Sequence, residues 1–484
     1  MSGTRRLKIP GEFKSRIAQG LAAIRHEQDL PEGFAADVES CAEHAAPNPC
    51  MPLLDLTEIA FVTIDPAGAM DLDQALFVER RDGGFRAHYA IADVAAFVRA
   101  GDAVDKEARR RGETLYGGNS KIPLHPKVLS EGAASLLPQQ LRPALVWCID
   151  LDEHGAIVTA MVRRARVCSR LRLDYDQVQT MIDSDQHDPM WSVLREIGEL
   201  RLARERERGG ISLPLPVQEV TADSTGRWQL TFRARHPVED WNAQISLLTG
   251  MAAAELMIRH RIGILRTLPP PLPQDIARLR RSAAALAIDW PQGLDYPSFI
   301  RRLDPARADH VAMMVDATTV LRGAGYVSFD GDLPESHTHG ALAANYAHTT
   351  APLRRLVDRF VGEICVALCA GEPVPAWVRE ALPELPMRMS ESGRRASRYE
   401  RAVLDLAEAQ VLSTRVGEVF DASVIDVNAT HPEQGQIMLR DPAVTAGITA
   451  AHALPLGQNV RVRLVEADPV RRHTRFELLG LADT

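Results

Sequence analysis

The chain has 484 residues, of which 45% are hydrophobic and 25% charged, and its net charge is −8. This length exceeds the size at which a single core keeps growing, so two or three soluble globular domains are expected. The negative net charge excludes a protein that coats nucleic acid through an overall positive potential. Basic clusters at 163–172, 299–302, 354–359 and 394–401 still allow a local basic channel, although each is equally typical of a solvated helix face.

Membrane and zinc-binding classes are not indicated either. No apolar run approaches the roughly 20 residues of a membrane span, and the N-terminal segment MSGTRRLKIPGEFK lacks the apolar stretch of a signal peptide. A cytoplasmic protein without a membrane partner is therefore expected. The cysteines contain no CxxC pair, so we expect no zinc and no disulfide framework. They stand at positions 41, 50, 148, 168, 365 and 369.

The N-terminal region, residues 1–54, combines an amphipathic helix and a linker. Residues 11–27 place Phe13, Ile17, Leu21 and Ile24 on one helical face, which must dock on another element. The proline-containing stretch 46–53 follows as the linker.

The central region, residues 55–393, has the pattern of an α+β domain. Strand-like alternation runs from 59 to 98 and includes Phe85, Tyr89 and Ile91. Longer helical patterns follow, which indicates strands packed against helices instead of a regular βαβ alternation. These helices are expected at 191–208, 241–260 and 353–369.

The C-terminal region consists of a charged connecting helix, assigned to 394–415, and a domain of short strands over 416–484. Short strands separated by turn-rich pieces fit an OB-fold, the barrel that binds single-stranded nucleic acid. Stacking of bases needs aromatic side chains, and this region contains only Phe420 and Phe476. The strands are expected at 416–427, 436–440, 459–465 and 474–479.

Three aspartates, Asp65, Asp71 and Asp73, follow a short apolar run in the segment FVTIDPAGAMDLDQAL at 61–76. Carboxylates this close repel each other unless a cation neutralises them. Oxygen ligands select a hard ion, so magnesium is the expected cofactor, with manganese as a possibility, and phosphoryl chemistry is indicated. A solvated acidic turn or a calcium loop is the alternative, but the glycine and glutamate of a calcium loop are missing.

Further blocks occur in a fixed order around this motif. The segment YAHTTAPLRRLVD stands at 346–358, and between it and the aspartates come AIADVAAFV (90–98), TLYGGNSKIPLHPKVLSEGAASLLP (114–138) and LDYDQV (173–178). Together these blocks resemble the ribonuclease II and ribonuclease R family, the RNB-domain 3′→5′ exoribonucleases. The resemblance implies an RNB-type catalytic domain, a mixed sheet surrounded by helices, that degrades single-stranded RNA to nucleoside 5′-monophosphates. Two small barrels commonly precede that domain in the family, and a short form without them is expected here.

The resemblance also implies roles for particular residues. Asp65, Asp71 and Asp73 would bind metal. Asp71 and Asp73 would also be catalytic residues, and Asp73 could orient the attacking water. Gln74 replaces the family's fourth aspartate and could still offer its amide oxygen to a metal. Arg354 would grip the scissile phosphate through its planar guanidinium. Without the upstream motif, an ion pair between Arg354 and Asp358 would be the better interpretation.

RNA contacts are expected from four more residues. Tyr116, and with less support Tyr175, would stack on bases, while His348 and Arg355 would contact the RNA backbone. A buried tyrosine and a structural histidine are the alternatives. The family's second stacking aromatic would fall within 211–227, where none occurs. An RNA-binding protein with weak or no turnover is the rival function, suggested by Gln74 and by the expected loss of the N-terminal barrels.

Overall fold

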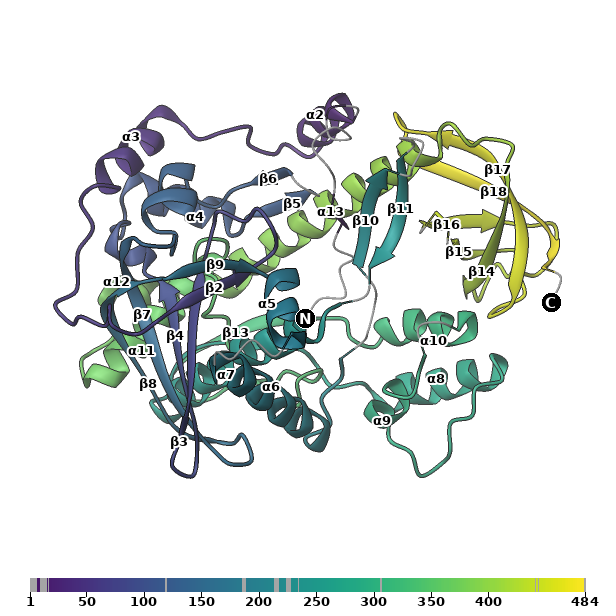
Figure 1. The fold of residues 1–484 in the computed structure, drawn as a ribbon. Coiled ribbons are helices and arrows are strands. Elements are labelled where there is room, and N and C mark those ends of the chain that lie inside the picture. The colour runs from purple at the N-terminus through teal and green to yellow at the C-terminus, as the bar shows by residue number, and fades with distance from the viewer. Residues whose placement is uncertain are drawn as a thin grey trace.

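The computed structural model describes residues 7–8, 15, 17–117, 120–184, 189–212, 217–222, 228–233, 235–304, 307–439, 441–442 and 444–482. These residues form an α+β domain around a six-stranded sheet and, at the far end of the molecule, a small closed barrel (Figure 1). The predicted fold class is therefore confirmed.

The central sheet is mixed, with one parallel pair at its end. Its strand order is β8-β7-β4-β3-β2-β9, and all neighbours are antiparallel except β2 and β9. The strands are β2 (Val62–Asp65), β3 (Gln74–Arg81), β4 (Gly84–Ala92), β7 (Leu141–Asp152), β8 (Ile157–Cys168) and β9 (Leu171–Asp174).

The two faces of this sheet carry side chains of different size. Large residues such as Tyr89 and Trp147 point to one face, where α6 (Pro189–Glu207), α7 (Pro237–Arg259) and α11 (Leu356–Ala370) pack on them. Small residues, including Ala90 and Ala165, point to the other face, where α3 (Ala36–Ala45) and α4 (Ala103–Arg111) contribute to the core. Alternation along each strand thus buries both faces. The helices predicted at 191–208, 241–260 and 353–369 correspond to α6, α7 and α11.

The long helix α13 (Leu385–Leu412) connects the sheet domain to the barrel. It begins earlier than the predicted residue 394. The N-terminal helix α2 (Ala18–Glu27) packs on it through Leu21 and Ile24, and a Cβ at Gly20 would lie 2.7 Å from the Leu406 side chain. The predicted amphipathic helix therefore docks on α13, while Phe13 lies outside the described residues.

The C-terminal barrel closes in the order β14-β15-β16-β18-β17, and the predicted OB-type fold is confirmed. Phe420 and Phe476 pack edge to face inside it, with ring centroids 6.1 Å apart, so neither offers a surface for stacking. Strand β16 was not predicted. The strands are β14 (Val419–Val427), β15 (Gln434–Leu439), β16 (Val444–Thr449), β17 (Asn459–Asp468) and β18 (His473–Leu481).

Shorter elements complete the molecule. Helix α10 (Ala308–Thr318) contacts β14, and its Val311 shares a core with Ile425 and Met438 of the barrel. Of the described helices, none is long and apolar enough to cross a membrane. The remaining elements are β1 (Leu7–Lys8), β5 (Leu115–Gly117), β6 (Ser120–Ile122), α5 (Tyr175–Asp183), β10 (Val217–Ala222), β11 (Trp228–Arg233), β12 (Ile262–Thr267), α8 (Pro273–Ala285), α9 (Tyr296–Ile300), β13 (Gly325–Asp330), α12 (Ala376–Ala381) and two short turns of helix, η1 (Val94–Ala96) and η2 (Val128–Ala133).

Candidate active site

The aspartate loop is held by the core on one side and presents carboxylates on the other. Asp65 ends β2, and Leu72, which is fully buried, lies between Asp71 and Asp73. Because alternate residues of an extended segment point to opposite sides, burial of Leu72 places both carboxylates on the opposite side. The Ser135 hydroxyl donates to the Met70 carbonyl at 2.7 Å and accepts from the Leu72 N–H at 3.0 Å. The loop conformation is thereby fixed from outside the motif.

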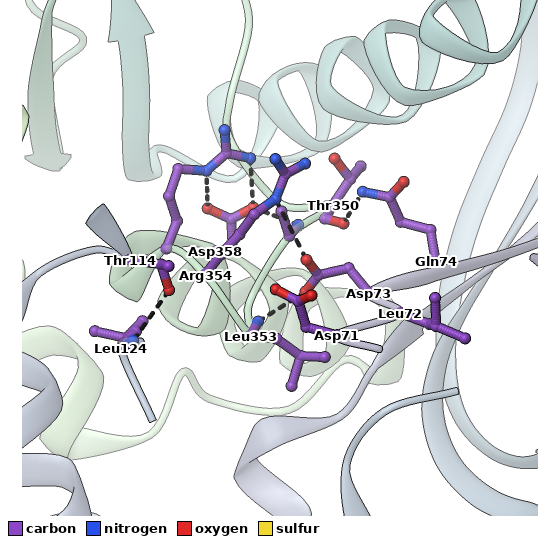
Figure 2. Close-up of polar contacts among 12 residues, drawn as sticks. Asp71, Leu72, Asp73, Gln74, Thr114, Leu124, Thr350, Leu353, Arg354 and Asp358 are labelled. Carbon is purple, nitrogen blue, oxygen red and sulfur yellow. Dashed lines mark hydrogen bonds and ion pairs between the residues drawn. The ribbon is translucent and has the colours of Figure 1, made fainter. Parts of the chain in front are cut away.

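The second predicted motif meets this loop. The Leu353 N–H donates to Asp73 Oδ1 at 2.8 Å, and Arg354 Nε lies 3.3 Å from Asp73 Oδ2 (Figure 2). The segment is also joined to the chain before β5, because the Thr114 N–H donates to the Arg354 carbonyl at 2.9 Å. Two motifs far apart in sequence therefore form one site, as predicted.

The two adjacent arginines have different partners. Arg355 makes a bidentate ion pair with Asp358, at 2.8 and 2.9 Å, and the same carboxylate accepts from the Ala351 N–H. Arg354 is directed toward Asp73, and 36% of its side chain is exposed. The alternative pairing of Arg354 with Asp358 is thus wrong. The prediction that Arg355 contacts RNA is not supported, since its guanidinium stabilises the loop before α11.

Burial shapes the electrostatics of the carboxylates. It raises the pKa of Asp65 to about 7, with Asp71 adding to the rise and Arg354 opposing it. Burial likewise raises the pKa of Asp73 to about 8, although Arg354 and the Leu353 N–H favour the charged form. Each ordinary value is 3.8. The ionised form of these two carboxylates is therefore unfavourable unless a cation stabilises it.

Asp71 already has a cationic partner. Lys121 Nζ lies 2.8 Å from Asp71 Oδ1 and 2.8 Å from Glu131 Oε1. Burial disfavours the ammonium, but the hydrogen bonds to these two carboxylates raise the pKa of Lys121 above its ordinary value. Sequence reasoning missed this pair. Lys121 lies within the block at 114–138, but no feature of the amino-acid sequence indicates that it pairs with Asp71.

Gln74 does not face the carboxylates. Its Nε2 donates to the Thr350 carbonyl at 2.5 Å, and its Oε1 accepts from the Tyr89 hydroxyl at 2.9 Å. The Tyr89 hydroxyl also bonds the Ser246 hydroxyl at 2.8 Å. Figure 2 shows the amide directed toward Thr350 rather than toward Asp71. This arrangement does not favour the predicted role of Gln74 as a metal ligand, because its oxygen is turned into the interior toward Tyr89.

The chemistry of the donor set fits a hard divalent ion. Asp65, Asp71 and Asp73 supply only carboxylate oxygens, the ligands that magnesium and manganese prefer. Such an ion would also stabilise the two carboxylates whose pKa values burial raises. Within the described residues, no three histidine, cysteine, aspartate or glutamate side chains are already arranged to hold a metal ion. Asp71 and Asp73 instead pair with Lys121 and Arg354.

Of the predicted RNA contacts, His348 is structural. Its Nδ1 lies 2.7 Å from the Tyr326 hydroxyl, and its ring packs edge to face against Tyr326 and Tyr346. Burial, together with Arg355 and Arg266, lowers its pKa well below the ordinary value of 6.5. A neutral, half-buried ring packed against two tyrosines is poorly suited to bind a phosphate. The structural alternative is therefore supported.

Tyr116 and Tyr175 lie at different distances from the centre. Tyr116, half-buried on β5, is near enough to Arg354 to help raise the pKa of that guanidinium, although burial opposes its charge. Tyr175 begins α5, directly after Asp174, which pairs with Asp65 between the parallel strands β9 and β2. Its half-buried ring packs against the main core. Tyr116 is thus the better placed of the two for contact with a bound chain.

A family model described as the RNB domain matches residues 54–370, more than half of the chain. The chain belongs to the RNB-domain family. A second model, described as the RNase II-type exonuclease C-terminal S1 domain, matches residues 418–479, which form the barrel. The resemblance inferred from the sequence blocks is confirmed.

Relatives and solved structures agree with this assignment. Ribonuclease R of Escherichia coli (strain K12) is 27% identical over 461 residues, covering 88% of this chain and 56% of that protein. Ribonuclease R of Mycoplasma pneumoniae is 24% identical over 468 residues, covering 88% of this chain and 64% of that protein. The chain thus spans between about half and two thirds of the length of these curated relatives.

The solved structures show the shared RNB fold. Mycoplasma genitalium RNase R in complex with ribose methylated single-stranded RNA superposes with a TM-score of 0.84 at 19% identity, covering 95% of this chain and 77% of that chain. Yeast Ssd1, described as a pseudonuclease, superposes with a TM-score of 0.68 at 16% identity, covering 93% of this chain and 58% of that chain.

Proposed function

We propose that this protein is a metal-dependent exoribonuclease that degrades single-stranded RNA in the 3′→5′ direction to nucleoside 5′-monophosphates. The observation that carries the proposal is the meeting of Asp73 and Arg354, 3.3 Å apart, from two motifs that define the family resemblance. A carboxylate beside a guanidinium is suited to phosphodiester hydrolysis, because one group orients water and the other pairs with phosphate oxygens.

The chain's own residues account for binding and orientation. The exposed part of the Arg354 side chain can pair with the non-bridging oxygens of a scissile phosphate, while its ion pair with Asp73 holds it in place. Asp73, which the Leu353 N–H holds in place, would orient the attacking water. Tyr116 would stack on a base near the 3′ end. A bound magnesium or manganese ion held by Asp65 and Asp71 would supply Lewis acidity and a lowered pKa for that water.

The test is product analysis of a 5′-labelled, unstructured RNA oligomer incubated with the full chain and magnesium. The label should move through progressively shorter fragments, and chromatography should find nucleoside 5′-monophosphates from the start. The Asp73→Asn protein serves as the control for contaminating nucleases. Release of nucleoside 3′-phosphates, or undiminished turnover in EDTA, would contradict the proposal.

A second candidate function is RNA binding with little or no turnover. It is favoured by the Gln74 amide, which replaces a charged ligand and is bonded to Thr350 and Tyr89. The yeast protein Ssd1, which shares the fold, is described as a pseudonuclease, so this architecture is compatible with loss of activity. Tight RNA binding without products in the same assay would support this second function over the first.

A further inference from the structure

Lys121 makes ion pairs with two carboxylates at the centre. Its ammonium nitrogen lies 2.8 Å from Asp71 and 2.8 Å from Glu131, and the three side chains are 22%, 16% and 23% exposed. An ammonium group has three N–H donors, and two are used here. Partial burial of both pairs limits screening by salt, so the charge of Lys121 acts strongly on Asp71.

Rigid elements deliver Lys121 to this position. It lies on β6, directly opposite Tyr116 on β5, so both side chains project from the same face of the hairpin. The hairpin in turn rests on α13, since a Cβ added to Gly117 would lie 2.8 Å from the Tyr399 ring. Glu131 comes from the helical turn η2. The ion pairs therefore join the hairpin, η2 and the aspartate loop.

The charges at the centre match one divalent ion. Asp65, Asp71, Asp73 and Glu131 carry four negative charges when ionised, and the cations Lys121 and Arg354 balance two of them. One divalent ion neutralises the remainder, whereas two would leave an excess of positive charge. In addition, Lys121 contacts Asp71 Oδ1, so the first ion already shares this carboxylate with an ammonium, and a second ion would have to share it with two cations. The inward-facing oxygen of Gln74 adds no ligand.

We infer that Lys121 is a resident counter-cation of Asp71 that limits the carboxylate cluster to a single divalent ion. The inference rests on the proposed function only in taking this cluster as the metal site. Lys121 acts here on metal stoichiometry and affinity, without contacting the reacting atoms.

The experiment is a titration of the full chain with Mn2+ alone, without RNA, followed by electron paramagnetic resonance of free Mn2+ and by calorimetry. The wild-type protein should bind one Mn2+ per chain. Lys121→Met should bind the first ion at least about tenfold more tightly, because a unit charge next to a divalent ion is removed, and should accept a second. Lys121→Arg, which keeps the charge, should behave as the wild type does. Lys127→Met, at an exposed lysine of the same segment, is the matched control and should change nothing.

Several outcomes would overturn the inference. They are two ions bound by the wild type, no Mn2+ bound by the wild type, or identical isotherms for the wild type and Lys121→Met. Circular dichroism checks that Lys121→Met folds, and Lys121→Gln, which can still donate a hydrogen bond to Asp71, provides a second neutral variant with the same expected result. Because RNA is absent, the binding result stands or fails independently of RNA degradation, which tests the proposed function separately.

Discussion

Gln74→Glu replaces one atom, the amide nitrogen, with oxygen. In the native protein this nitrogen donates to the Thr350 carbonyl at 2.5 Å, while the amide oxygen accepts from Tyr89 at 2.9 Å. An ionised carboxylate would set an oxygen against the Thr350 carbonyl oxygen. The introduced carboxyl must therefore take up a proton, so that it can donate, or leave Thr350 without its partner.

The cost of each route can be worked out. Protonating a glutamate with an ordinary pKa of about 4.3 at pH 7 costs about 3–4 kcal/mol, since each pH unit is worth about 1.4 kcal/mol. Leaving a buried acceptor unpaired costs about 1–3 kcal/mol. The cheaper route sets the loss, so the free energy of unfolding should fall by about 1–3 kcal/mol at pH 7. At pH 5 protonation costs only about 1 kcal/mol, and the loss should shrink accordingly.

The assay is urea unfolding followed by tryptophan fluorescence, for which Trp147, buried in β7, reports on the central sheet. The wild type and Gln74→Glu are compared at pH 5 and pH 7 in EDTA and in magnesium. Tyr89→Phe is the matched control, because it deletes the other hydrogen bond of the amide without adding a titratable group. The decrease in the free energy of unfolding caused by Tyr89→Phe should be the same at pH 5 and pH 7.

Either of two results would refute the reasoning. If Gln74→Glu were as stable as the wild type at pH 7 in EDTA, the calculated cost of losing the bond to Thr350 would be wrong. If it gained more stability from magnesium than the wild type does, the side chain at position 74 would face a metal. Its observed bonds to Thr350 and Tyr89 would then not be those of the working protein.

Four further outcomes are expected. Asp73→Asn should abolish RNA turnover in the oligomer assay but keep RNA affinity in filter binding, because the amide oxygen can still accept from the Leu353 N–H; a parallel loss of both would indicate misfolding. Arg354→Lys should lower the rate steeply, since a point charge cannot reproduce the bidentate fork, and near-normal rates would make Arg354 structural. Tyr116→Ala should weaken binding of the RNA 3′ end by about 1–3 kcal/mol and lengthen the final fragment, whereas an unchanged fragment would place Tyr116 outside the RNA path. In EDTA, thermal stability should fall as pH rises from about 4 to 8, because the folded protein retains protons on Asp65 and Asp73 up to pKa values of about 7 and 8 while the unfolded chain loses them near 3.8. Magnesium should reduce this dependence, and a flat pH profile in EDTA would contradict the raised values.

The sequence by itself determined the features that depend on neighbouring residues. The spacing of Asp65, Asp71 and Asp73 after an apolar run predicted a cluster of carboxylates, and periodicity predicted α6, α7 and α11 within a few residues. Spacing of short apolar runs likewise predicted the barrel, although β16 was missed. These predictions were possible because strands bury alternate residues and helices bury every third or fourth residue. Both periodicities are visible in a short stretch of sequence.

Only the tertiary structure decided how the charged and polar groups of the site pair. Arg354 and Arg355 are adjacent, but α11 begins at Leu356, so Arg355 reaches Asp358 and Arg354 reaches Asp73. The basic cluster at 163–172 lies on β8 and β9 instead of a helix, and there Arg164 pairs with Asp93 and Glu363.

The same holds for Gln74 and Lys121. By its place in the motif, Gln74 was predicted as a ligand, but the folded chain brings Tyr89 and Thr350 to its amide. Lys121 reaches Asp71 because the β5–β6 hairpin rests on α13, far from both in sequence. A hydrogen bond or ion pair depends on distances of about 3 Å between atoms. Such distances are set by the packing of elements that lie from 15 to 276 residues apart in the sequence, so no local pattern could predict them.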